Sequence, residues 1–178
     1  MFSKKIEINL EKPDDIIHLE PISDIHIGHA GFDEEHYKKR IKAISKDKNR
    51  YTFFGGDALD AITTYDKRFN PDMSLEHDID NQRLRWQDMT QPLFDIHAKS
   101  RNEKVWGFFH GNHDYKIPQI SRAYLQNTMC TPNDLTFMGS RGVMGLEVKY
   151  NRKVLAQWSI LFMHGSGGGK PERMMEQM

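Results

Sequence analysis

The sequence predicts a mixed α/β fold, and two observations support this. Strand-like runs and amphipathic helix-like segments alternate along the chain, and no internal repeat or low-complexity tract interrupts them. The strand-like runs are short and stop at glycine, aspartate, asparagine or histidine, as strands do where they run into loops. With 178 residues, we expect a single domain that spans residues 1–178.

The first part of the chain predicts a strand, a helix and a second strand. Residues 16–22 form an apolar-rich strand, in which Pro21 favours a sheet edge or a bulge because proline donates no ladder hydrogen bond. A helix begins at Asp33 and extends to about residue 48, with one apolar face. Residues 51–54 are aromatic and β-branched and form the next strand.

The rest of the chain continues the alternation. Residues 63–81 are polar and contain proline, so we expect a long loop of the functional or mobile kind. A helix follows at 81–97, and Pro92 should kink or divide it. The remaining predicted elements are a strand at 105–109, a helix at 118–127 and a hairpin of strands 142–150 and 153–163 that turns at Asn151-Arg152.

Charge balance and cysteine content exclude several classes of protein. The 25 Lys and Arg offset 25 Asp and Glu, so no overall charge attracts nucleic acid or an anionic membrane. Cys130 is the single cysteine, which excludes an internal disulfide and indicates a reducing compartment or an ordinary free thiol. No stretch resembles a signal peptide or a membrane span. We therefore expect a soluble, cytoplasmic protein with no membrane partner.

Four predicted strands end in residues that can bind a metal. These residues are Asp24 and His26, Asp57, Asn112 and His113, and His164. Open α/β sheets bind ligands at the carboxyl ends of their strands, so these side chains could converge. A mixture of carboxylate, amide oxygen and imidazole suits manganese, iron, zinc or nickel better than a thiolate-seeking metal. The competing interpretation is that they are turn and cap residues with only local hydrogen bonds.

Taken in order, these residues resemble the motifs of the calcineurin-like metallophosphoesterases. The matching segments are Asp24-Ile25-His26, Gly56-Asp57, Gly111-Asn112-His113-Asp114 and His164-Gly165. Each segment is weak alone, and their conjunction over residues 16–165 carries the resemblance.

The resemblance implies a four-layer αββα sandwich and a two-metal phosphoesterase. Asp24 and His26 would hold one divalent ion, Asp57 would bridge both, and Asn112 with His164 would hold the second. Manganese is the favoured ion, with iron, zinc or nickel as alternatives. A hydroxide bridging the two ions would attack a phosphate mono- or diester. His113 would be the general acid that protonates the leaving oxygen, and Asp114 would orient its ring.

The family's last motif, Gly-His-x-His, is missing after His164. Each ion would then lack one ligand, and we expect weaker metal binding and uncertain activity for this chain. A C-terminal truncation of the sandwich is the favoured explanation, because residues 172–178 resemble the opening of a helix. Ligands supplied by a second subunit or by water are the alternative.

The substrate and the oligomeric state stay open. The context Ser23 to Gly28 resembles repair nucleases to some degree, which keeps a nuclease acting on DNA as an alternative although the charge does not indicate one. A non-catalytic scaffold or an inactive fragment with the same fold is the other alternative. The presence of both His113 and Asp114 favours chemistry over a scaffold.

Other polar residues receive structural interpretations. Asp60 has the spacing of a second acid after the bridging aspartate, but we expect it to start a helix. His110 is taken as a core residue or a hydrogen-bond donor behind the site, and Arg83 and Arg85 as solvated helix residues. Residues 165–170 resemble a phosphate-binding loop, but His164 stands where its first glycine is required and Pro171 where its Ser or Thr is required. The histidines expected at the surface or in packing are His18, His29, His36, His77 and His97.

Overall fold

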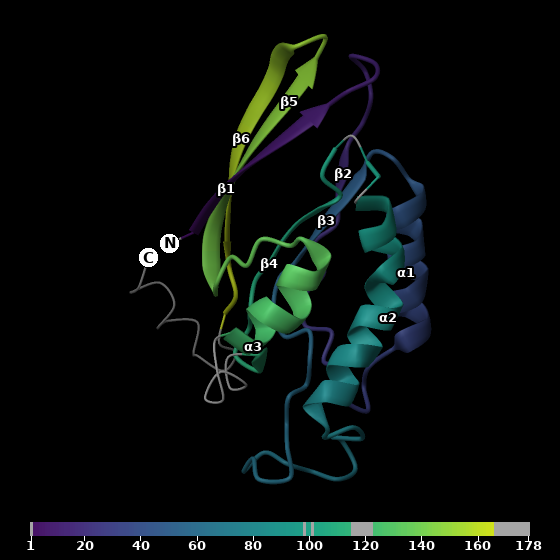
Figure 1. The fold of residues 1–178 in the computed structure, drawn as a ribbon, viewed down its shortest axis with the longest axis vertical. Coiled ribbons are helices and arrows are strands. Elements are labelled where there is room, and N and C mark those ends of the chain that lie inside the picture. The colour runs from purple at the N-terminus through teal and green to yellow at the C-terminus, as the bar shows by residue number, and fades with distance from the viewer. Residues whose placement is uncertain (1, 98, 101, 115–122, 166–178) are drawn as a thin grey trace, which may run out of the picture.

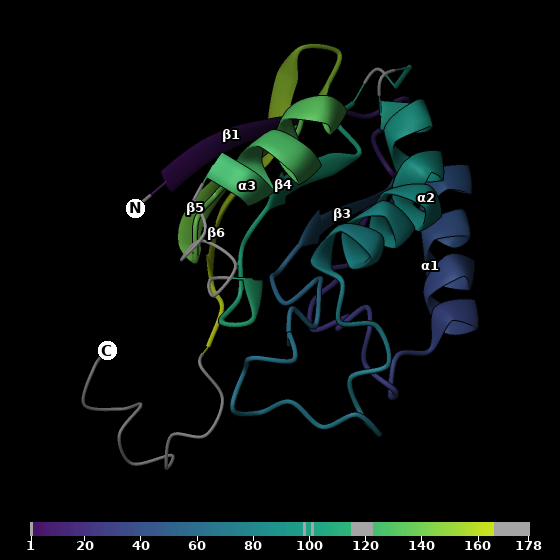
Figure 2. The same ribbon diagram turned by 60° about the horizontal axis from the view of Figure 1, so that its bottom comes forward.

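Two three-stranded sheets pack face to face, and helices cover the outer side of one of them (Figures 1 and 2). The computed structural model describes residues 2–97, 99–100, 102–114 and 123–165. The strands are β1 (Phe2–Asn9), β2 (His18–Leu19), β3 (Arg50–Phe54), β4 (Val105–Phe108), β5 (Arg141–Tyr150) and β6 (Lys153–Met163). The helices are α1 (Glu34–Lys46), α2 (Ile79–His97) and α3 (Ala123–Leu125), the last continued by the helical turns η2 (Gln126–Cys130) and η3 (Thr131–Asn133). The predicted mixed α/β class is confirmed.

The helix-covered sheet has the order β2-β3-β4, and all its strands are parallel. β2 is an edge strand and is shorter than the predicted strand at 16–22. Its pairing nevertheless extends beyond Leu19, because the amides of Glu20 and Ile22 donate to Tyr51 and Phe53 across the sheet. Pro21 lies between these two amides, which places it on a sheet edge as predicted.

α1 is confirmed with its predicted start. Asp33 caps the helix, and its side chain accepts from the backbone amide of His36 at 2.9 Å. Tyr37, Ile41 and Ile44 are buried against the parallel sheet and α2. This stripe of three residues explains why the first helix packs flat on the sheet.

α2 is a single helix from Ile79 to His97, so the prediction that Pro92 might divide it is wrong in that respect. Pro92 lies on the exposed side of the helix. The carbonyl that loses its partner there can be hydrated, which makes proline tolerable. The opposite side of α2 buries Trp86, Met89 and Leu93 in the core that it shares with α1.

The second sheet has the order β1-β5-β6. β1 is a strand that we did not predict, and it pairs in parallel with β5 over its whole length. The hairpin of β5 and β6 is confirmed, and Asn151 and Arg152 both have positive φ at its turn, at 49° and 65°. β6 is the far edge of this sheet.

An apolar and aromatic layer joins the two sheets. Ile6 and Ile8 of β1 and Met144 of β5 face Phe53 and Trp106 of the parallel sheet. The Phe162 ring of β6 lies 5.1 Å from that of Phe53 and 4.5 Å from that of Phe109, measured between centroids. The layers in the described residues are therefore helices, parallel sheet and mixed sheet.

The helix predicted at 118–127 is described only in part, since residues 115–122 lie outside the described residues, as do 166–178. From Ala123 the helical turns run beyond the predicted end to Asn133, and Asp134 ends them with a φ of 52°. Cys130 on η2 is buried, and burial raises its pKa to about 12. This favours the interpretation of Cys130 as an ordinary, unreactive thiol.

None of the helices in the described residues combines the length and apolar character needed to cross a bilayer.

Candidate metal centre

Asp57 lies at the centre of the candidate site, three residues beyond the end of β3. Its side chain is almost fully buried, and the residue is 3% exposed. Its Oδ2 atom lies 3.3 Å from His164 Nε2 and 3.9 Å from His26 Nε2. Its Oδ1 atom accepts from the backbone amide of His113 at 2.8 Å. A carboxylate between two imidazoles from different sheets has the position that the resemblance gives to a bridging ligand.

The first group of potential ligands consists of Asp24, His26 and Asp57. Their donor atoms all lie within 4.8 Å of one another. Each of the three has a left-handed backbone, with φ of 55°, 51° and 50°. Left-handed backbone is uncommon outside glycine and is concentrated at functional sites, where the fold holds it for a purpose.

The second group consists of Asn112 and His164 with Asp57. Nδ1 of His164 lies 2.9 Å from the carbonyl oxygen of Gly55, and so Nδ1 carries the proton and Nε2 presents its lone pair. That lone pair faces Asn112 Oδ1 at 3.3 Å and Asp57 Oδ2 at the same distance. Three electron-pair donors thus converge with no hydrogen between them, which is an arrangement that a cation stabilises.

Two glycines permit this convergence. Gly56 has a φ of 106°, and a Cβ there would lie 2.6 Å from the amide nitrogen of Gly111. A Cβ on Gly111 would lie 2.6 Å from the backbone nitrogen of Asp57 and closer still to its carboxylate. The loops after β3 and β4 can therefore approach each other only because neither residue has a side chain.

Asp60 is a member of the site, and the prediction that it starts a helix is wrong. No helix begins near it, and it is 1% exposed. Its Oδ1 atom lies 3.6 Å from Nδ1 of both His26 and His113. Asp60, His26 and His113 form a second set whose donor atoms lie within 4.8 Å of one another. The sequence signal for Asp60 was its three-residue spacing from Asp57.

His113 has its ring held at both nitrogens. Nδ1 lies 2.6 Å from the carbonyl oxygen of Asp60 and therefore donates to it. Nε2 then accepts from Nη1 of Arg68 at 3.2 Å, because a guanidinium can only donate. The ring is only partly buried and lies edge-on to the ring of His26, with 4.5 Å between centroids.

Asp114 does not orient the His113 ring, contrary to our expectation. It is fully buried, and its carboxylate accepts backbone amides from Gly111 at 3.0 Å, Leu59 at 3.3 Å and Ala58 at 3.4 Å. Burial raises its pKa to about 6. Asp114 thus ties the loop after β4 to the loop after β3, while Asp60 contacts the ring.

Arg68 is a site residue that the sequence interpretation missed. It belongs to the long polar loop predicted at 63–81, where no helix or strand is present until α2 begins at Ile79. The only signal was the general one that such loops are functional. Arg85, by contrast, pairs with Glu34 on the helix surface as expected, whereas Arg83 pairs with Asp80 but is only 17% exposed, so the expectation of a solvated side chain is wrong for Arg83.

The pKa of His26 is raised, mainly by its interaction with Asp60 and further by the charges of Asp57 and Asp24. Protonation of His26 competes with metal binding, since the ligand is the neutral ring. The affinity of the site for a cation should therefore fall as the pH falls. His29 lies near this ring, but its Nδ1 accepts from the amide of Gly31 at 2.9 Å.

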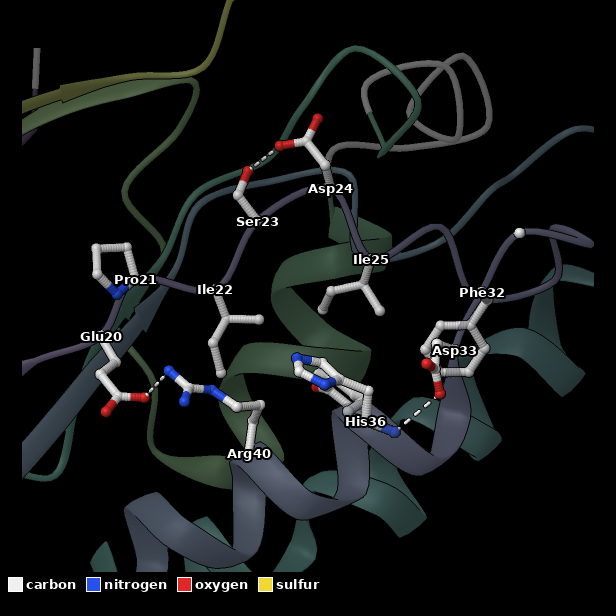
Figure 3. A pocket seen from close by; sticks show the side chains of 12 residues that line it. Glu20, Pro21, Ile22, Ser23, Asp24, Ile25, Phe32, Asp33, His36 and Arg40 are labelled. Atoms are coloured by element: carbon white, nitrogen blue, oxygen red, sulfur yellow. Dashed lines mark hydrogen bonds and ion pairs between the residues drawn. The ribbon is translucent and has the colours of Figure 1, made fainter.

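A pocket of about 320 Å³ lies beside the first group, between residues 20–25 and the start of α1 (Figure 3). Ile22, Ile25 and Phe32 give it apolar walls. The ion pair of Arg40 with Glu20 closes one end. Of the residues that line it, only Asp24 is a candidate ligand. The Asp24 carboxylate accepts a hydrogen bond from the Ser23 hydroxyl.

The other four predicted ligands are thus brought together around Asp57, and the five offer oxygen and imidazole donors with no thiolate. This donor set fits manganese, iron, zinc or nickel. Comparison of the chain with protein-family models, with curated proteins and with solved structures finds no match.

Proposed function

We propose that this protein is a metal-dependent phosphoesterase of the calcineurin-like kind, with the corresponding four-layer fold. The observation that carries the proposal is the position of Asp57 between two groups of donors, Asp24 with His26 and Asn112 with His164. The sequence order of these residues resembles that family, and the convergence of their side chains supports the resemblance.

The proposed site holds two divalent ions, with manganese favoured. Asp24, His26 and Asp57 would hold the first, and Asp57, Asn112 and His164 the second. Bound there, the ions would supply the activation of a water molecule and the neutralisation of phosphate oxygens. The carbonyl of Gly55 holds His164 in the tautomer that a ligand needs.

His113 is the proposed general acid. Its Nδ1 atom is fixed on the carbonyl oxygen of Asp60, which leaves Nε2, the nitrogen that faces Arg68 Nη1, as the atom that would carry the transferred proton. The buried Asp60 carboxylate also lies 3.6 Å from Nδ1, so that both the backbone and the side chain of Asp60 lie against this side of the ring. The ring therefore needs no large movement to transfer a proton.

Hydrolysis assays test this proposal. The manganese-loaded protein should release p-nitrophenol from p-nitrophenyl phosphate or from bis(p-nitrophenyl) phosphate, and chelation should abolish the release. Asp57→Asn should abolish turnover, and His113→Asn should lower kcat by about 100-fold or more. Asp72→Asn, which changes an exposed carboxylate of the 63–78 loop, is the matched control and should not alter turnover.

Absence of metal-dependent turnover of both esters by the folded protein would contradict the proposal. Turnover that survives Asp57→Asn would equally contradict it, because no other described carboxylate lies between His26 and His164.

A further inference from the structure

Arg68 is held in place by a loop that is itself anchored. The amides of Leu75 and Glu76 donate to the carbonyl oxygen of Gly28, and Ala30 donates to Met73. Within the loop, Asp66 fixes the turn before Arg68, since its Oδ1 atom accepts the backbone amide of Arg68 at 2.9 Å. The position of the Arg68 backbone is thus tied to the segment that carries Asp24 and His26.

The Arg68 guanidinium is also oriented. Nε and Nη2 donate to the two oxygens of Asp66 at 3.1 Å and 2.8 Å, which is a two-point contact. Nη1 remains for His113 Nε2 at 3.2 Å. The side chain is 29% exposed, so the group is open to an incoming ligand.

The contact with Nε2 defines the side of the site on which Arg68 lies. If His113 is the general acid, Nε2 is the atom that meets the leaving oxygen. A guanidinium hydrogen-bonded to that nitrogen lies where the leaving group would meet His113. A cation beside a leaving group attracts a leaving group that is itself anionic.

Resting on the proposed function, we propose that Arg68 is a specificity-determining residue that selects substrates whose leaving group carries its own phosphate, as in a phosphoanhydride. Nη1, the donor that Asp66 does not bind, would shift from Nε2 of His113 to an oxygen of the departing phosphate. Asp66 keeps the other donors in place. A neutral alcohol leaving group offers no partner for this cation.

The reaction is hydrolysis of the P–O–P linkage. Water adds to the scissile phosphorus, and the bond from that phosphorus to the bridging oxygen breaks. Once the guanidinium has left Nε2, that nitrogen takes up a proton from solvent, and the bridging oxygen takes this proton as it leaves with the second phosphate. The attacking water releases one proton to solvent, so that protons balance and no oxidant or further reactant is needed.

Two substrates separate leaving-group recognition from general effects. We would measure kcat and KM for inorganic pyrophosphate and for p-nitrophenyl phosphate with the manganese-loaded protein, Arg68→Gln, Arg68→Lys and the neighbouring exposed control Lys67→Gln. Arg68→Gln should raise KM for pyrophosphate by about tenfold to 100-fold, because a charge-assisted hydrogen bond is lost. KM for p-nitrophenyl phosphate should stay within about twofold. Arg68→Lys should recover part of the loss, and Lys67→Gln should change neither constant.

An equal rise of KM for both substrates would overturn the inference, since Arg68 would then act on the scissile phosphate. Unchanged constants for both would overturn it as well. Turnover of p-nitrophenyl phosphate without turnover of pyrophosphate would remove the leaving-group inference and leave the proposed phosphoesterase intact. Turnover of neither of these two substrates would overturn the leaving-group inference, and the proposed phosphoesterase would fall only if bis(p-nitrophenyl) phosphate were not hydrolysed either.

Discussion

The parallel sheet β2-β3-β4 and the mixed sheet β1-β5-β6 share one apolar interface but treat their charged groups in opposite ways. Beyond its carboxyl ends, the parallel sheet buries Asp57, Asp60 and Asp114 within a short distance of one another. On its outer face, the mixed sheet places Glu7 and Glu147 opposite each other on β1 and β5 and pairs both with Lys5 and Lys149.

The backbone shows the same contrast. The loops after β2 and β3 contain left-handed residues at Asp24, His26 and Asp57, whereas the positive φ values of the hairpin occur only at its turn. Crowded acids and unusual backbone cost stability, and folds retain them where they serve a site. The left-handed backbone and the buried acids of the candidate site thus lie on loops of the parallel sheet, and the mixed sheet adds His164 to it.

Two single glycine substitutions, one beside the candidate site and one in the mixed sheet, should show the largest difference in stability. Gly111→Ala places a Cβ against the backbone and carboxylate of Asp57, and we expect a loss of about 3 kcal/mol or more in the free energy of unfolding. Gly145→Ala on β5 meets no atom within 4 Å and should be neutral or slightly stabilising. Urea unfolding of both variants measures this, and equal losses would contradict the contrast.

The interface between the sheets is tested at β6. Phe162→Ala removes a ring that packs on Phe53 and Phe109 and should cost about 2 kcal/mol. The neighbouring Leu161→Ala, whose side chain is 67% exposed, should change stability by less than about 0.5 kcal/mol. Thermal and urea unfolding should agree on this order, and a reversed order would mean that β6 does not dock as described.

Asp60→Asn tests whether the buried acids beside the parallel sheet contribute to metal binding. Removing the charge beside His26 and His113 should weaken manganese binding by about tenfold, because groups behind a ligand orient it and raise its basicity. Isothermal titration calorimetry measures the affinity, and Asp72→Asn is the control with an exposed carboxylate. An affinity unchanged by Asp60→Asn would show that the buried acid serves folding alone.

The smallest expected effect lies on the outer face of the mixed sheet. Hydrogen bonds from Lys149 and Gln157 lower the pKa of Glu147 to about 2. Since the folded-state pKa lies below the unfolded value, this stabilisation is present above about pH 4.5 and is lost as the pH falls toward 2. Glu147→Gln should therefore flatten the acid side of the stability profile slightly, as followed by unfolding at several pH values.

The pKa of Asp114 is shifted in the opposite direction from that of Glu147, so its contribution to stability depends on pH in the opposite sense. Its folded-state pKa of about 6 lies above the unfolded value. Its contribution to stability is therefore complete below about pH 3.8 and is lost as the pH rises through 6. A wild-type profile without this opposing pair of trends would contradict the described difference between the sheets.

Local patterns predicted much of the fold. The Asp33 cap, the buried face of α1 and the β5-β6 turn follow from signals within a few residues of each other. β1 was missed because it pairs with β5, which is distant in the sequence. The alternation of Ile6 and Ile8 with charged residues was nevertheless a signal of a strand. Pairing between such distant segments depends on the whole fold.

The candidate ligands could be predicted wherever a single aspartate, asparagine or histidine at the end of a predicted strand identified the position. The motif spacing identified Asp57 and the four donors around it, but it could not distinguish Asp60 from Asp114 as the partner of His113. That choice depends on how the loops after β3 and β4 pass each other at Gly56 and Gly111. Arg68 reaches the site from a loop without a motif, so only the folded chain reveals it.

His164 follows directly after β6, which is an edge strand of the mixed sheet in the described residues, while the other candidate ligands come from loops of the parallel sheet. An ion held by His164 and Asp57 would be a cross-link between the sheets. By thermodynamic linkage, the ion would resist separation of the sheets, and fraying of the last residues of β6 would release the ion. Amide exchange near Met163 should therefore slow when metal is added.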